Sequence, residues 1–441
     1  MFTPHTKQDE KEMLDVIGVS SVKELVNKIP ADLLYPNYNL PAALTEQHLT
    51  AHLHALAAKN KPLTNFIGAG MYEHFIPAAV PALSGRGEFL TAYTPYQAEA
   101  SQGTLQTIYE FQSCICALFD MDVATASHYD GATALAEAVL AAHRVTGRKE
   151  IIISSLLHPH YKEVLKTYTR HTGLTITEAQ PTQKGTLDVA ALQAQISDKT
   201  ACVVIANPNF LGYIEQVQEI SALTHEKGAL LVAQVNPISL GVLQTPGSYE
   251  ADFAVAEGQV LGNPVSFGGP GLGIMTAKKA YMRQLPGRMV GIAKDKNGRR
   301  AFVLTLQARE QHIRREKAAS NICSNEAICA LNAVIYLTLL GPQGLKEVAE
   351  LNLERARQLA EKIGRVKGFS VSTSAPFFNE FVVTCPVPAA QVIEKLADKG
   401  IAAGYDLSAT CPSMKNCLLV CATEMRSAAD IDAYARALEG K

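Results

Sequence analysis

Two short segments of this 441-residue chain combine polar side chains in patterns that a binding site could use. Tyr93-Thr94-Pro95-Tyr96-Gln97 places two phenols, a hydroxyl and an amide before a predicted helix. It can line a pocket, or it can be a proline-fixed turn whose tyrosines pack on the core. Tyr129-Asp130-Gly131-Ala132-Thr133 begins a second predicted helix, where free backbone amides can hold a phosphate.

Asp130 argues against phosphate binding at that helix start. Gly131 and Thr133 suit a phosphate, but a carboxylate in the N-cap position would occupy the free amides and repel an anion. We therefore predict that Asp130 caps the helix.

The sequence offers no set of metal ligands. His158-Pro159-His160 brings two imidazoles together, but no third ligand lies near them in the sequence, and catalytic zinc usually has three protein ligands. The nine cysteines include no CxxC pair, so we expect buried thiols in a reducing compartment. We predict no metal site.

Composition excludes several classes of protein. The formal net charge is −2 and no Lys/Arg run occurs, so we expect no nucleic-acid partner. The longest apolar stretches are the length of strands, so we expect no membrane span, and the charged N-terminus does not resemble a signal peptide. These features predict a cytoplasmic protein.

The elements that would position these segments fall into three parts. Residues 1–60 read as a helical arm, with amphipathic helices at Lys7–Ile17 and Thr45–Ala58. Residues 61–320 read as a large domain in which apolar strands alternate with helices, which is typical of a mostly parallel sheet covered on both faces. Residues 321–441 read as linking helices and a small α+β domain.

This α/β layout resembles fold-type I enzymes that use pyridoxal phosphate (PLP). Such a site needs a lysine that forms a Schiff base, an acid that keeps the pyridine nitrogen protonated, and a helix N-terminus for the phosphate. The chain has no Lys or Arg from Gly228 to Ala277, and Asn263 lies in the segment where the lysine belongs. We expect Lys278 and Lys279, which follow, to face solvent.

The acid is also missing at its expected position. The strand at Ala229–Val235 ends with Gln234 and Asn236, whose neutral amides cannot supply the charge that holds a pyridinium. Together with the Asp130 cap, these replacements predict a degenerate cofactor site at Asp130, Gly131, Thr133, Asn236 and Asn263.

Four longer stretches resemble the glycine decarboxylase P-protein family, in the order that the family has them. The first is Gly68–Val80, and the second is Tyr93–Ser113 with Met121–Ala138. The third is Ala206–Glu215 with Asn236–Leu243 and Glu257–Gly273, and the fourth is Gly298–Ala327. The length of the chain fits the alpha chain of the family's two-chain form. Within the last stretch, we expect Arg309–Lys317 to form one helix whose basic face is solvated by default, with contact to an acidic carrier protein as the alternative.

The resemblance implies a partner in a complex. In that family two alpha and two beta chains decarboxylate glycine with PLP and pass the aminomethyl group to the lipoyl arm of H-protein, and the beta chain carries the lysine. By this resemblance the chain has no catalytic residue or cofactor of its own, and Tyr93, Thr94, Pro95, Tyr96 and Gln97 reach the shared active site. An autonomous PLP enzyme and a non-catalytic binding or regulatory protein remain alternatives.

Overall fold

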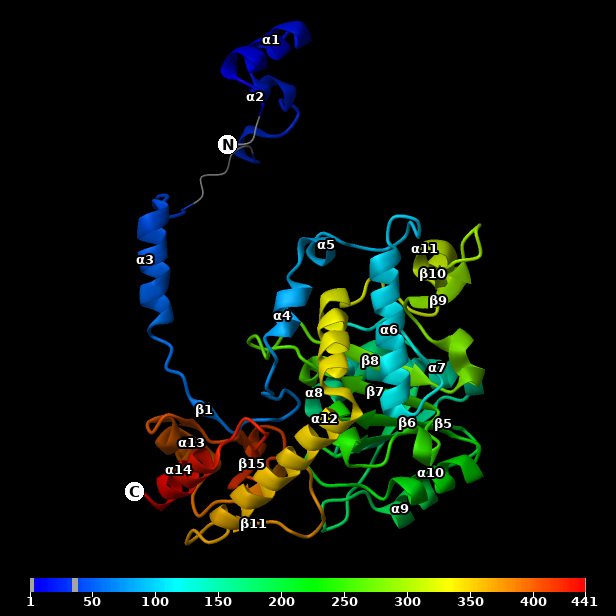
Figure 1. Ribbon diagram of the computed structural model, residues 1–441, viewed down its shortest axis with the longest axis vertical. Coiled ribbons are helices and arrows are strands. Elements are labelled where there is room, and N and C mark those ends of the chain that lie inside the picture. The colour runs from blue at the N-terminus through cyan, green and yellow to red at the C-terminus, as the bar shows by residue number, and fades with distance from the viewer. Residues whose placement is uncertain (1–3, 34–38, 441) are drawn as a thin grey trace. The chain divides into compact units, whose positions relative to one another are not determined.

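The computed structural model describes residues 4–33 and 39–440 (Figure 1). The chain divides into two units, Met1–Lys61 and Pro62–Lys441. The sequence-based division into residues 1–60, 61–320 and 321–441 stays a prediction.

The N-terminal unit contains the helices α1 (Lys7–Ile17), α2 (Val22–Leu25) and α3 (Glu46–Ala57), with a short 3-10 helix at Ala31–Leu33. Thr6 begins α1 through a capping box with Asp9, and Gly18 ends it in the left-handed conformation. Leu49, Leu53 and Leu56 of α3 are exposed. No described residue of α1, α2 or α3 is buried. The apolar side chains of these helices therefore form no hydrophobic core within this unit.

A seven-stranded sheet forms the centre of the second unit, in the order β2-β8-β7-β6-β5-β3-β4. The strands are β2 (Val123–Ala124), β3 (Glu150–Ser154), β4 (Thr175–Ala179), β5 (Thr200–Asn207), β6 (Leu230–Val235), β7 (Phe253–Glu257) and β8 (Gly273–Ala277). The five strands from β7 to β4 are parallel, whereas β8 runs antiparallel to both β7 and β2. This confirms the predicted large α/β domain with a mostly parallel sheet.

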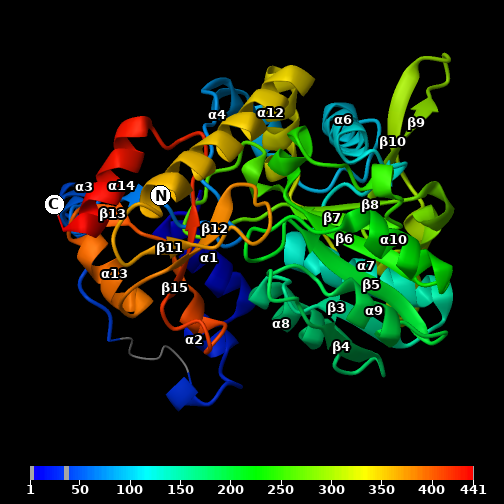
Figure 2. The same ribbon diagram turned by 90° about the horizontal axis from the view of Figure 1, so that it is seen from below.

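Helices cover both faces of this sheet (Figure 2). They are α6 (Gln102–Phe119), α7 (Gly131–Thr146), α8 (Pro159–Thr169), α9 (Val189–Gln195) and α10 (Val217–Glu226). Side chains alternate along a strand, so Val203 and Ile205 of β5 join the core under α6 and α10. Val204, between them, joins a second core under α7 and α8.

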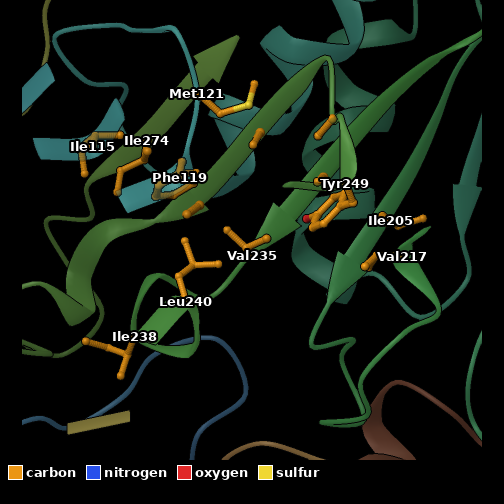
Figure 3. Close-up of a cluster of buried hydrophobic side chains, with 14 of the residues drawn as sticks. Ile115, Phe119, Met121, Ile205, Val217, Val235, Ile238, Leu240, Tyr249 and Ile274 are labelled. Carbon is orange, nitrogen blue, oxygen red and sulfur yellow. The ribbon is translucent and has the colours of Figure 1, made fainter. Parts of the chain in front are cut away.

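The first core gathers side chains from distant parts of the chain (Figure 3). Ile205 and Val235 come from neighbouring parallel strands, Phe119 comes from the end of α6, and Tyr249 is fully buried near them. This packing fixes the carboxyl ends of β5 and β6, which carry the candidate site.

Helix α12 (Ala327–Ile363) links the large sheet to the C-terminal part of the unit. Gly341 interrupts it with φ 60° before Pro342, so two helical segments meet at a kink. Among the described helices, α12 alone is long and apolar enough to cross a membrane by length and composition. Its Ala330, Ala333 and Tyr336 lie in the first core, which is typical of a core helix in a folded domain.

The C-terminal part is a small α+β layer. Its antiparallel sheet has the order β11 (Ser370–Val371), β12 (Glu380–Thr384), β15 (Cys417–Cys421), β14 (Tyr405–Asp406), and it packs with α13 (Ala389–Ala397) and α14 (Ala428–Glu439). Strand β1 (Thr64–Asn65) pairs with β13 (Ile401–Ala402). The remaining α-helices and strands are α4 (Ala79–Ser84), α5 (Gly87–Leu90), α11 (Gln311–Arg314) and the hairpin of β9 (Met289–Lys294) and β10 (Arg300–Thr305).

Candidate functional site

A small polar cavity lies at the carboxyl ends of β5, β6 and β7, where open α/β sheets usually bind ligands. Gln234, Asn236 and Glu257 line it from the sheet, and Asn379 and Glu380 line it from the segment that begins β12. The cavity measures about 50 Å³, which is room for a few water molecules, whereas pockets for cofactors and drug-sized ligands measure about 300–1,000 Å³.

The N-terminus of α7 adjoins this cavity, and side chains already occupy its amides. Asp130 is the N-cap, as predicted, and accepts a hydrogen bond from the Thr133 amide at 2.7 Å. The Gly131 amide donates to Oε2 of Glu257 at 2.9 Å. Two carboxylates therefore satisfy donors that a phosphate would need.

Glu257 was missed by the sequence reasoning. Its Oε1 accepts from the amides of Gln259 and Leu272, at 3.0 and 2.7 Å, so the carboxylate ties together three backbone segments. Burial raises the pKa of Glu257, while these backbone bonds act in the opposite direction. The signal in the sequence was a carboxylate at the end of an otherwise apolar strand.

Gly131 has no room for a side chain. A Cβ atom there would lie 2.2 Å from the Tyr161 hydroxyl and 2.8 Å from the Glu257 amide nitrogen. Tyr161 lines the cavity, and burial raises its pKa well above the ordinary value. Tyr161 and the Glu257 backbone therefore leave no space for a ligand group next to Gly131 at the start of α7.

Asn263 does not reach the cavity. Its amide accepts from Nδ2 of Asn332 at 2.9 Å and donates to the Cys329 carbonyl at 3.2 Å, so the buried side chain faces α12. No lysine of the described residues lines the cavity.

The two lysines that follow the lysine-free span differ from each other. Lys279 is exposed, as predicted, whereas Lys278 is half-buried and pairs with the buried Asp252 at 2.9 Å. The prediction that Lys278 simply faces solvent was wrong, because Asp252 adds a buried charge beside it. Asp252 precedes β7, so this pair lies at the opposite end of the strand from Glu257.

These residues do not fit PLP. The helix amides face two carboxylates, and Gln234 and Asn236 supply neutral amides where an acid would be needed. Asn236 is also committed to capping the short helix η2 (Pro237–Gly241), through the Ile238 amide at 3.0 Å.

Glu380 closes the cavity from the other side. It accepts from the Ala69 amide and from the Tyr72 hydroxyl, both at 2.6 Å, and burial raises its pKa to about 7. His158 also bonds to Ala69, because its Nε2 lies 2.8 Å from that carbonyl. Burial lowers the pKa of His158 to about 4, so the ring is neutral near pH 7.

Among residues 4–33 and 39–440, no three His, Cys, Asp or Glu side chains form a metal-binding group.

The Tyr93–Gln97 segment lies apart from the cavity lining and faces outward. Tyr93 and Tyr96 are 80% and 58% exposed, while Pro95 between them is buried. The Tyr96 hydroxyl accepts from Nη2 of Arg288 at 3.3 Å, and the guanidinium carbon lies 5.4 Å from the ring centroid. The structure thus separates the two groups of residues that the sequence analysis selected.

Comparison with known proteins gives a match along the whole chain. Residues 1–438 match the model of the glycine cleavage system P-protein family. Proteins named probable glycine dehydrogenase (decarboxylating) subunit 1 are similar throughout. The one from Geotalea uraniireducens (strain Rf4) is 49% identical, covering 100% of this chain and 99% of the relative. The one from Chlorobium phaeobacteroides (strain DSM 266 / SMG 266 / 2430) is 52% identical, covering 98% of each.

Solved structures agree with the family match. The crystal structure of a glycine decarboxylase P-protein in inhibitor-bound form superposes with a TM-score of 0.93 at 43% identity, covering 100% of this chain and 99% of that one. A sphingosine-1-phosphate lyase from Burkholderia pseudomallei has a TM-score of 0.66 at 14% identity, covering 93% and 94%, and shows the fold alone. The predicted fold-type I class is confirmed. With its full length matched, this chain belongs to the glycine cleavage system P-protein family.

Proposed function

We propose that this chain is the alpha subunit, or subunit 1, of a two-chain glycine dehydrogenase (decarboxylating). The complex decarboxylates glycine, releases CO2 and transfers the aminomethyl group to the lipoyl arm of H-protein. The observation that carries this proposal is the end-to-end similarity, near 50% identity, to proteins with that printed name.

The chain binds no cofactor itself, and PLP belongs to the beta subunit. The main support is the start of α7, where Asp130 and Glu257 take the amides that a phosphate would need. The small volume of the cavity gives further support. Both features weigh against an autonomous PLP enzyme.

The partners are the beta subunit, in an assembly of two alpha and two beta chains, and lipoylated H-protein, while glycine is the substrate of the complex. The exposed apolar side chains of α1 and α3 support a large contact with another chain. The described cysteines are all free thiols, which supports a cytoplasmic location.

This chain contributes surface residues to the active site of its partner. Tyr96 is the strongest candidate, since its ring is exposed while Arg288 holds its hydroxyl in place. A fixed phenol can shape a small pocket and donate a hydrogen bond to a substrate oxygen. Because PLP and the active site belong to the beta subunit, the isolated chain has no glycine decarboxylase activity.

The test is to purify the chain alone and together with the beta subunit. Each preparation is incubated with PLP, reduced with borohydride and analysed by peptide mass spectrometry. We expect a labelled lysine only in the beta chain, and glycine-dependent CO2 release only in the assembled complex. A labelled peptide from this chain would favour the autonomous enzyme. Failure of the two chains to co-purify would favour a separate binding or regulatory protein.

A further inference from the structure

Arg288 is a buried cation whose hydrogen bonds are incomplete. Its side chain is 4% exposed, and it lies directly before β9, where its carbonyl accepts from the Ala126 amide at 2.9 Å. Nη1 reaches Oδ1 of Asn325 at 3.4 Å and Nη2 reaches the Tyr96 hydroxyl at 3.3 Å. Nε is buried and has no partner.

Both partners of Arg288 are neutral, and both contacts are long for hydrogen bonds. Within the described parts of the chain, the side-chain hydrogen bonds of its guanidinium go to Asn325 and Tyr96, and none goes to a carboxylate. Buried arginines are normally paired, because an uncompensated charge is costly to remove from water. Arg426 shows the usual arrangement, since it is 6% exposed and pairs with Glu73 at 2.8 Å.

The side chains that contact the Arg288 guanidinium are themselves held by neutral groups. Asn325 is held by Ser127, whose hydroxyl accepts from Nδ2 at 3.2 Å. His128 is fully buried beside Gly287, and neither of its ring nitrogens has a partner. Arg288 therefore keeps a buried donor, Nε, without a partner, and its other donors make only long contacts to neutral groups.

The geometry limits the kind of anion. A guanidinium presents its donors as a planar fork that matches a carboxylate. Tyr96, which is 58% exposed, covers the buried fork and belongs to the segment that we place at the active site of the partner chain. Glycine has no side chain, so its carboxylate is its only anionic group. A cofactor phosphate is instead suited to a helix N-terminus.

We propose that Arg288, oriented by Asn325 and covered by Tyr96, binds the carboxylate of glycine in the active site that this chain shares with the beta subunit. This inference rests on the proposed function. Arg288 supplies the charge that selects an amino acid over a simple amine, and Tyr96 shields the pair from water.

The test uses the assembled, PLP-loaded complex with Arg288→Gln or Arg288→Lys in this chain. Calorimetry gives the dissociation constants of glycine and of methylamine, which lacks the carboxylate. We expect Arg288→Gln to weaken glycine binding by about 10- to 100-fold and Arg288→Lys to weaken it less. Methylamine binding and PLP content stay unchanged. Arg357→Gln removes an exposed arginine of α12 and is the matched control, with no expected effect.

Several results would overturn the inference. Unchanged glycine affinity in both variants would show that Arg288 does not meet the substrate. Equal losses for glycine and methylamine, or loss of PLP, would assign Arg288 to the pocket shape or to the phosphate. If neither variant assembles, Arg288 instead pairs with a side chain of the beta subunit. A wild-type complex that does not bind glycine at all would reject the proposed function itself.

Discussion

Replacing Glu380 with glutamine is expected to change how the stability of the complex depends on pH. Glu380 is 5% exposed, and burial raises its pKa from 4.5 to about 7. A raised pKa means that the folded protein holds the proton more tightly than the unfolded chain does. The contribution of Glu380 to stability is therefore complete below pH 4.5 and is lost as the pH rises to about 7.

The magnitude follows from the two pKa values. At about 1.4 kcal/mol per pH unit, the difference between 4.5 and about 7 corresponds to about 3 kcal/mol. Glutamine keeps an oxygen for the Ala69 amide at this position but does not titrate. Across this window, the wild-type protein should lose about 3 kcal/mol relative to Glu380→Gln. For a unit of this length, that corresponds to about 4 °C in Tm.

The assay is differential scanning calorimetry of the complex at pH 5 and pH 8, with wild-type chain and with Glu380→Gln. Taking the difference between the two proteins at each pH removes the contribution of groups that titrate in both. Glu354→Gln alters an exposed carboxylate of α12 and is the matched control. If Glu380→Gln and wild type show the same pH dependence of Tm, the burial argument for Glu380 is wrong.

Three further substitutions test other parts of the structure. Tyr96→Phe should slow glycine-dependent CO2 release per PLP-loaded complex by roughly 100-fold, with little change in Tm. If this variant keeps full activity, the Tyr96 hydroxyl does not take part in catalysis. Glu257→Gln should destabilise the chain by about 2 kcal/mol, seen as a lower denaturant midpoint, without gain of PLP binding. Gly212→Ala should cost more than about 3 kcal/mol, because its Cβ would lie 2.1 Å from the Glu380 carbonyl oxygen. Gly400→Ala, with a similar positive φ and open space, is the control and should cost only about 1 kcal/mol. Equal melting temperatures for the two glycine variants would contradict the steric argument.

Local sequence signals predicted most of the regular structure. The span of α1 was predicted residue for residue, and Asp130 was correctly placed as the cap of α7. Both depend on contacts within one or two turns of helix, so neighbouring residues are enough to specify them. Apolar strands alternating with helices likewise indicated the central sheet.

Predictions failed where packing overrides local preference. Arg309–Lys317 was expected to be one helix with a solvated face, but it breaks into short turns, and Arg309 donates to the Leu285 carbonyl. Arg315 lies in the left-handed region, with φ 54°, where a continuous helix is excluded. The hairpin of β9 and β10 was not predicted.

The sequence by itself determined the family, the lysine-free span and the neutral residues Gln234 and Asn236 at the end of β6, because composition and order are enough for these. Only the tertiary structure decided that Glu257 also occupies the start of α7 and that the buried Arg288 contacts neutral side chains. Glu257 and Gly131 are 126 residues apart, and Arg288 and Tyr96 are 192 apart. Contacts of this range form when whole layers pack together, so no local pattern records them.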